Sequence, residues 1–463
     1  MCGIIALLRG PGTRTLLPAS DVLGRLDAIS RRVLEGGAAA VVADAAASAL
    51  EELDRALRDP DGVALLVRES EVATRVRAAS EAIGDWIATA EAELDASGPG
   101  DGGTLEATNA ALLRLKDALW AVERDRVSTA LKVRDLVGAS AGWSAIEIGT
   151  SIQQALSAID RLEVRGRDSA GLTVLVRDHG LDLDDPAIAR LVTDRSSDPL
   201  FRSRAVRTPE GHLSFVYKAA AEIGELGDNT AAMRREISAD ELLRLALAGE
   251  RASALVLGHT RWASIGIISQ PNAHPVDSHE VDRVDGPYVT AALNGDVDNF
   301  ADLKAADGLR LAAEITTDAK VIPTLVSRRL GEGADLTTAF RDTVAGFEGS
   351  VAIGASSASS PDHLLLALRG SGQALYVGLA DGCYVVASEP YGVVELTDTY
   401  LRMDGETPAN EDNPNASRGQ IVVLDGARAG TIEGITRQSY DGTALPVTQD
   451  ELQRAQVTTR DID

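Results

Sequence analysis

An apolar run opens the chain, and a long region of helical spacing follows it. Residues 1–9 carry the run CGIIALL, and Gly-Pro-Gly follows at residues 10–12, which predicts a short buried strand closed by a turn. From about residue 18 to 136 the apolar residues recur at helical spacing, so this region predicts a helical hairpin or a small bundle. One apolar stripe in it comprises Leu112, Leu115, Leu119 and Val122.

After this region the pattern changes to short apolar segments separated by helical ones. A last amphipathic helix before the change carries Ile148, Ile152, Leu156 and Ile159. The apolar segments are LTVLV (172–176), SALVLGHT (253–260), YVTAALN (288–294), SVAIGAS (350–356), ALYVGL (374–379) and CYVVAS (383–388). Their lengths are typical of strands, and no internal repeat is evident, so the residue pattern alone predicts an α+β fold.

Composition excludes several classes of function. The 463 residues suggest two or three structural units, and the net charge of −25 argues against nucleic acid and anionic membrane surfaces as partners. No apolar run is long enough to span a bilayer. Two cysteines allow one disulfide at most, which fits a reducing compartment. We therefore expect a cytoplasmic protein.

Cys2 stands directly behind Met1, and this position gives it a special chemistry. Removal of Met1 would leave Cys2 with both a thiol and a free α-amine. Their reference pKa values are about 8.5 and about 7.7–8.0, so one residue could supply both nucleophile and base near neutral pH. Gly3 leaves room for backbone to approach the reacting carbon. The alternative is a small hydrophobic residue on a strand.

Polar residues at the ends of apolar segments offer further chemistry. Arg261 and Trp262 end one strand, where the guanidinium could bind a carboxylate and the indole could cover a small substrate. Asn294 and Gly295 are either a simple turn or two donors of an oxyanion hole. Asp318, in the first turn of an expected helix, either complements the helix dipole or binds a substrate ammonium group.

Several separated motifs occur in an order that resembles a known family. The motifs are Cys-Gly-Ile-Ile after Met1, RGRDSAG, GHTRWAS with NAHP downstream, NGDVDN and TTDAKVI. In this order they resemble class II glutamine amidotransferases, which are N-terminal-nucleophile (Ntn) hydrolases, and within them the glutaminase domain of glucosamine-6-phosphate synthases. The resemblance covers residues 1–10 and roughly 146–463. It implies an Ntn-hydrolase four-layer αββα sandwich, here with an inserted α-helical subdomain.

Carried onto this sequence, the resemblance implies the catalytic and substrate-binding residues. The thiolate of Cys2 would attack the side-chain amide carbon of glutamine and form a γ-glutamyl thioester that water hydrolyses. Asn294 and the Gly295 N–H would stabilise the oxyanion. Arg261 would bind the α-carboxylate of glutamine, and Asp318 would bind its α-ammonium group.

The same resemblance implies supporting roles. Trp262 would belong to a lid or to the passage for ammonia, and Arg165 would order the N-terminal cysteine. His259 and His274 match the family pattern, and we interpret both as structural hydrogen-bonding residues in preference to general bases. Asn272 is a candidate for positioning the loop around it.

The match departs from the family at three positions and in one long segment. Leu293 and Ile265 stand where the family usually has histidine, and Ser264 replaces a threonine, which leaves open how ammonia is guided and how the loop closes. About 130 residues also separate the Cys2 strand from the first family helix. This block is either a docking or regulatory insertion or a surface insertion without a specific partner.

We therefore expect three parts. Residues 1–17 and 141–450 form the amidotransferase domain, residues 18–140 the inserted helical subdomain, and residues 451–463 the start of a linker. No stretch after residue 390 resembles a sugar-isomerase domain, so the chain is either a fragment of a longer synthase or the partner of a separate synthase chain.

The resulting hypothesis is a glutaminase for the conversion of fructose 6-phosphate to glucosamine 6-phosphate. The expected partners are L-glutamine and a sugar-phosphate isomerase (SIS-type) domain or chain, and a homo-oligomer remains open. No cofactor is expected, and no metal, because the six histidines and two cysteines show no recognised ligand spacing. The alternatives are a glutaminase that feeds another ammonia acceptor and a non-catalytic scaffold with the same fold.

Overall fold

The computed structural model describes residues 2–12, 14–96, 102–220, 225–282, 286–409, 412 and 417–462, without the side chains of Thr104 and Arg165. Its internal contacts divide the chain into two compact units. We call them the sandwich unit, Met1–Gly12 with Gln154–Val457, and the helical unit, Thr13–Gln153 with Thr458–Asp463. The domain boundaries of the sequence analysis stay predictions.

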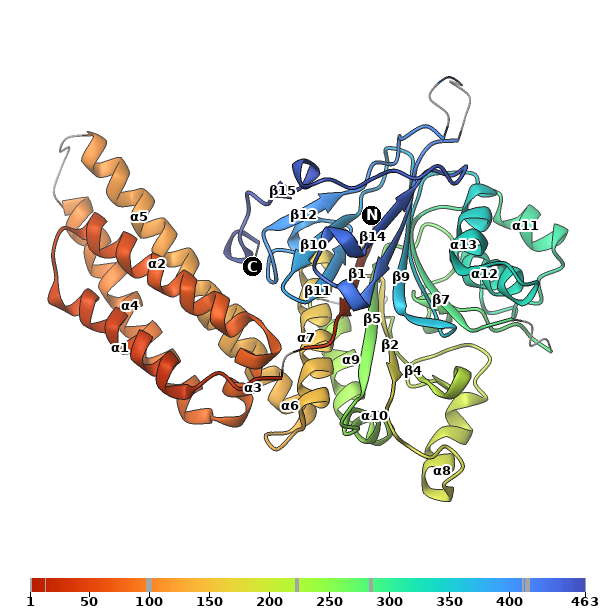
Figure 1. Ribbon diagram of the computed structural model, residues 1–463, viewed down its shortest axis with the longest axis horizontal. Coiled ribbons are helices and arrows are strands. Elements are labelled where there is room, and N and C mark those ends of the chain that lie inside the picture. The colour runs from red at the N-terminus through yellow and green to blue at the C-terminus, as the bar shows by residue number, and fades with distance from the viewer. Residues whose placement is uncertain are drawn as a thin grey trace. The chain divides into compact units, whose positions relative to one another are not determined.

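The larger sheet of the sandwich unit has nine antiparallel strands in the order β15-β12-β10-β11-β1-β5-β2-β4-β3. They are β1 Gly3–Arg9, β2 Ser169–Arg177, β3 Val206–Arg207, β4 Leu213–Ala219, β5 Ser253–Arg261, β10 Tyr376–Ala380, β11 Cys383–Ala387, β12 Thr399–Arg402 and β15 Gln453–Arg454. The expected N-terminal strand is thus confirmed as β1, which lies between β5 and β11 near the middle of the sheet (Figure 1). Strand β15, in the segment assigned above to a linker, pairs with β12.

A second sheet of six antiparallel strands has the order β14-β13-β9-β8-β7-β6. These are β6 Val276–Asp277, β7 Val289–Gly295, β8 Val351–Ser357, β9 Ser360–Arg369, β13 Gln420–Asp425 and β14 Ile435–Gln438. One hydrophobic cluster joins the two sheets: Ile4, Ala6 and Leu8 of β1 pack with Leu364 and Leu366 of β9. Residues two apart on β1 share this face because strand side chains alternate.

Helices cover the outer faces of both sheets (Figure 1). On the six-stranded sheet, α12 Val321–Gly331 and α13 Leu336–Ala345 pack against β7, β8 and β9 in a second cluster. On the nine-stranded sheet, α9 Asp228–Ser238 contacts β2 and β4, and the end of α7 Trp143–Leu162 approaches β1 and β5. The sandwich unit is therefore an αββα arrangement, which confirms the expected α+β fold class. This unit also contains the helices α8 Pro186–Ser196, α10 Glu241–Leu247 and α11 Phe300–Ala306.

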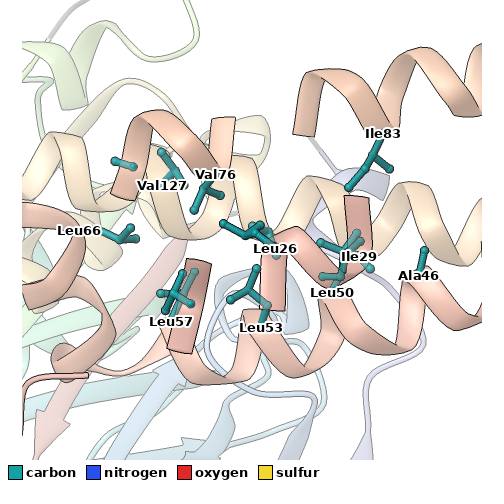
Figure 2. Packing of buried hydrophobic residues seen from close by; sticks show 14 of the residues in the cluster. Leu26, Ile29, Ala46, Leu50, Leu53, Leu57, Leu66, Val76, Ile83 and Val127 are labelled. Carbon is teal, nitrogen blue, oxygen red and sulfur yellow. The ribbon is translucent and has the colours of Figure 1, made fainter. Parts of the chain in front are cut away.

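The helical unit has a hydrophobic core of its own. Its helices are α1 Ala19–Glu35, α2 Ala39–Arg58, α3 Pro60–Arg68, α4 Ser70–Ala96, α5 Gly102–Trp120, a π-helical segment Ala121–Ser128, α6 Thr129–Val137 and the first part of α7. Leu26, Leu53 and Val76 point into this core from three helices (Figure 2). The predicted stripe faces inward, since Leu112, Leu115 and Val122 are buried and Leu119 packs at the core edge. In the described part of the chain, no helix combines the length and apolarity needed to cross a bilayer.

Candidate active site

Cys2 lies at the start of the central strand and faces the end of β5. The register pairs Gly3 with Thr260, which brings Cys2 next to the residues that follow β5. The Trp262 N–H donates to Cys2 Sγ at 3.3 Å, and the thiol lies 3.5 Å from the Trp262 carbonyl oxygen. Burial raises the pKa of the Cys2 thiol, although the Trp262 N–H and the Arg261 charge act in the opposite direction. Cys2 is therefore a thiol held in a fixed place.

A tight approach of α7 fixes the backbone behind Cys2. A Cβ atom at Gly3 would lie 2.7 Å from Leu162 Cβ, closer than two carbon atoms can pack. Any other residue at Gly3 would therefore push β1 away from α7. Glycine at this position keeps the start of β1, and with it Cys2, in place.

Asn294 and Gly295 end β7 beside Cys2. Asn294 Nδ2 donates to the Cys2 carbonyl oxygen at 3.1 Å, which places the amide next to the cysteine. Gly295 has φ +87, and a Cβ there would lie 1.9 Å from the Ser350 carbonyl oxygen, so only glycine fits. The two predicted oxyanion donors are thus adjacent to the predicted nucleophile.

Two buried histidines lie behind Asn294. His259 Nε2 lies 2.9 Å from the Leu293 carbonyl oxygen and 3.0 Å from Asn294 Oδ1. Burial, with the nearby Arg261 charge, lowers the pKa of His259 to about 3, so its ring is neutral near pH 7. The rings of His259 and His274 have centroids 4.6 Å apart. The hydrogen bond from His259 fixes the orientation of the Asn294 side-chain amide.

His274 connects this layer to the segment before Asp318. Its Nδ1 lies 3.2 Å from the Leu293 carbonyl oxygen, and its Nε2 lies 2.9 Å from Thr317 Oγ1. Burial lowers the pKa of His274 well below its usual range. Asn272 fixes the same segment, because its Oδ1 accepts from the Thr316 N–H at 2.7 Å and from the Thr317 N–H at 2.9 Å.

Asp318 is buried at the start of a short 3₁₀ turn that leads into α12. Its Oδ2 accepts from the Val297 N–H at 2.7 Å, which ties it to the loop after Gly295. Burial raises the pKa of Asp318, and the charge of Asp296 adds to this effect, while the Arg261 charge lowers it. In the described part of the chain, Asp318 has no cationic side chain bonded to it.

Arg261 is buried at the end of β5 and holds the loop that follows it. Its guanidinium donates to the carbonyl oxygen of Ile265 and, at 3.4 Å, to that of Ile267. Trp262 is 59 % exposed, so its indole projects from the surface beside Cys2. The carboxylate of Asp168 accepts from the Ala263 N–H at 2.9 Å and anchors the same loop.

The structure brings together eight of the nine predicted site residues: Cys2, Asn294, Gly295, Arg261, Trp262, Asp318, His259 and His274. The side chain of Arg165 lies outside the described residues. Sequence reasoning gave no role to Asp168 or Asp296, although both lie inside the motifs it singled out. Leu293, at the place of a family histidine, is buried in the cluster between the six-stranded sheet and its helices.

Comparisons with known proteins find relatives by sequence and by fold. No family model matches the chain. Three curated relatives are named glutamine--fructose-6-phosphate aminotransferase [isomerizing]. The protein of Halalkalibacterium halodurans is 31% identical over 193 residues, 42% of this chain and 28% of that protein. That of Bacillus thuringiensis subsp. konkukian is 29% identical over 248 residues, which cover 54% of this chain and 32% of that protein. That of Geobacillus kaustophilus is 35% identical over 151 residues, which cover 32% of this chain and 24% of that protein.

Two solved structures are similar at a lower level. One is the allosteric regulatory enzyme of purine biosynthesis, with 17% identity, a TM-score of 0.39, and 63% of this chain and 46% of that chain covered. The other is glutamine phosphoribosylpyrophosphate amidotransferase from B. subtilis, with 16% identity, a TM-score of 0.38, and 63% and 47% covered. The chain spans about a quarter to a third of the length of the curated relatives it matches. Over these segments the chain is similar in sequence to glutamine--fructose-6-phosphate aminotransferases, at 29–35% identity.

Proposed function

We propose that this chain hydrolyses L-glutamine to glutamate and ammonia through a thioester on Cys2. The observation that carries the proposal is the pair of hydrogen bonds to one cysteine. The Trp262 N–H donates to Cys2 Sγ, and Asn294 Nδ2 donates to the Cys2 carbonyl oxygen. A nucleophile and an amide donor side by side are what acyl transfer from an amide requires.

The raised pKa of Cys2 means that a base must take the thiol proton. His259 and His274 have lowered pKa values, and their rings form hydrogen bonds with Asn294, Thr317 and the Leu293 backbone. We assign the role to the α-amine that Cys2 gains when Met1 is removed. The proton passes from sulfur to this amine and then to the departing nitrogen.

The bond changes follow from these positions. The Cys2 sulfur bonds to the side-chain carbonyl carbon of glutamine, and the oxyanion accepts hydrogen bonds from Asn294 Nδ2 and the Gly295 N–H. The carbon–nitrogen bond breaks, and ammonia leaves. Water then attacks the thioester, which releases glutamate and restores the thiol.

The two charged ends of glutamine have complementary partners. Arg261 is a buried cation at the start of the loop that follows β5. Asp318 is a buried carboxylate without a bonded cation among the described residues. We assign the α-carboxylate to Arg261 and the α-ammonium group to Asp318. Trp262, exposed beside Cys2, would cover the bound amino acid. Fixing both ends aligns the amide carbon with sulfur.

We further propose fructose 6-phosphate as the ammonia acceptor and a sugar-phosphate isomerase domain or chain as the partner. The curated relatives carry this activity in their names, and this chain matches about a quarter to a third of their length. The cytoplasmic location stays a prediction. A rise in glutamine hydrolysis on adding fructose 6-phosphate and a candidate synthase chain would support this acceptor, and no rise would favour another one.

Labelling with the glutamine analogue 6-diazo-5-oxo-norleucine, followed by intact mass and peptide mapping, tests the reaction. We expect loss of Met1 and one adduct on Cys2. Cys383→Ala is the matched control, because the second cysteine is fully buried in β11 and should not carry label. Cys2→Ala should take no label and release no ammonia. Retained Met1 with no adduct in folded protein would overturn the proposal.

A further inference from the structure

Asp296 is a carboxylate at the site that the reaction above does not use. It follows Gly295 at the end of β7, where its N–H donates to the Ser350 carbonyl oxygen at 3.3 Å. Its Oδ1 accepts from Ser264 Oγ at 2.7 Å. Ser264 belongs to the loop after Arg261, so this bond ties the loop beside Cys2 to the strand end that carries the oxyanion donors.

The position of Asp296 brings its charge close to both ends of the site. The backbone N–H of the next residue, Val297, binds Asp318 Oδ2 at 2.7 Å. The negative charge of Asp296 raises the pKa of Asp318 and also that of Cys2. The charge of Asp296 therefore acts both on the residue assigned above to the α-ammonium group and on the cysteine thiol.

Two neighbouring carboxylates repel each other unless a cation lies near both. Ser264 binds only Oδ1 of Asp296, and no described residue donates to Oδ2. Among the described residues, the Arg261 guanidinium donates to two groups, both carbonyl oxygens of its own loop. An ammonium group on the ligand would relieve the repulsion, whereas a ligand without one would leave it in place.

We propose that Asp296 is a specificity-determining residue, whose carboxylate anchors the loop through Ser264 and, with Asp318, selects substrates that carry a free α-ammonium group. This inference rests on the proposed glutaminase function. The inference predicts that the Asp296 charge disfavours amides without an α-ammonium group. Anchoring of the loop through Ser264 would not by itself produce this selectivity.

The test compares glutamine with glutaramate, the analogue that lacks only the α-amino group. Glutamate release gives the KM for glutamine, and inhibition of that release gives the inhibition constant for glutaramate, whose own hydrolysis would yield glutarate and no glutamate. In Asp296→Asn we expect the KM for glutamine to rise about tenfold, the size of one charged hydrogen-bond partner, while the inhibition constant for glutaramate stays the same or falls. The preference for the ammonium group therefore drops about tenfold.

Two variants separate charge from loop anchoring. Ser264→Ala keeps the carboxylate and removes its hydrogen bond, so it should weaken both ligands by the same factor. Asp298→Asn makes the same charge change at an exposed position two residues away, and should change neither constant. Equal weakening of both ligands in Asp296→Asn, or no change in either, would overturn the inference.

The outcomes also separate this inference from the proposed function. If the wild-type protein releases no ammonia and takes no label from the glutamine analogue, the glutaminase function fails and the inference fails with it. If the wild-type protein is active and Asp296→Asn keeps the full preference for the ammonium group, the inference alone fails.

Discussion

The helical unit and the sandwich unit each bury a carboxylate, and the two differ in their partners. Asp54 of α2 lies 2.6 Å from Arg126 Nε and also binds Arg58. Asp318 of the sandwich unit is held by the Val297 N–H, with no cation bonded to it in the described part of the chain.

The environments move the two pKa values in opposite directions. Burial alone would raise the pKa of Asp54, but the charges of Arg126 and Arg58 outweigh it and hold this pKa below its usual range. Burial raises the pKa of Asp318, and Asp296 adds to it. A carboxylate that already has its partners contributes to the fold, whereas one left without them is available to a ligand.

The largest expected effect comes from removing the charge of Asp318. In Asp318→Asn, kcat/KM for glutamine should fall about a hundredfold or more, because a buried ammonium group would lose its charged partner. The thermal midpoint should stay the same or rise, since a carboxylate with a raised pKa is unfavourable in the folded state when ionised. Steady-state kinetics and thermal unfolding check both. A large loss of stability would mean that Asp318 is structural.

Asp54→Asn should give the opposite result. Leaving Arg126 buried without its carboxylate should lower the free energy of unfolding by about 3–5 kcal/mol, while kcat and KM of the folded protein stay unchanged. Denaturant unfolding measures the first effect. Glu52→Gln is the control: it changes an exposed carboxylate of the same helix, 3.6 Å from Arg25, and should cost less than about 1 kcal/mol.

The two carboxylates should also respond differently to acid. Asp54 has a lowered pKa in the folded state, so its contribution is present above the unfolded pKa of about 3.9 and is lost as the pH falls through the folded value. The unfolding free energy of the wild-type protein should therefore fall more steeply below pH 4 than that of Asp54→Asn. Parallel pH profiles for the two proteins would contradict this assignment.

The smallest expected effect is a shift of the acid limb of activity. Asp318 must be ionised to bind an ammonium group, and its raised pKa places this limb of kcat/KM above the usual range of an aspartate. Besides burial, four groups act on it: Asp296 raises this pKa, while the Val297 and Ala319 N–H groups and Arg261 lower it. Asp296→Asn should therefore move the limb to lower pH. A shift to higher pH would contradict the charge arrangement.

How much the sequence predicts differs between the two units. Helical spacing predicts the inward stripe of α5, because helix periodicity is local. The position of β1 between β5 and β11 does not follow from any periodicity, since strand pairing joins distant segments. The family resemblance, now supported by the curated relatives, was needed to place Cys2, Asn294 and Asp318 together.

Asp168 and Asp296 show where the sequence analysis stopped. Both lie inside quoted motifs, but their partners, Ala263 and Ser264, belong to a loop far along the chain. A short polar motif does not reveal which distant N–H or hydroxyl group it will bind. Only the folded structure shows that both aspartates hold the same loop.

The bond between His259 and Asn294 sets which end of a nearly symmetric amide faces the cysteine. His259 Nε2 lies against the Leu293 carbonyl oxygen, which can only accept, so this nitrogen carries the proton and the adjoining end of Asn294 must be its oxygen. The –NH₂ end is thereby turned to Cys2. Because burial lowers the pKa of this ring to about 3, the orientation of the Asn294 amide, and with it the polarity of the proposed oxyanion hole, should not change with pH near neutrality.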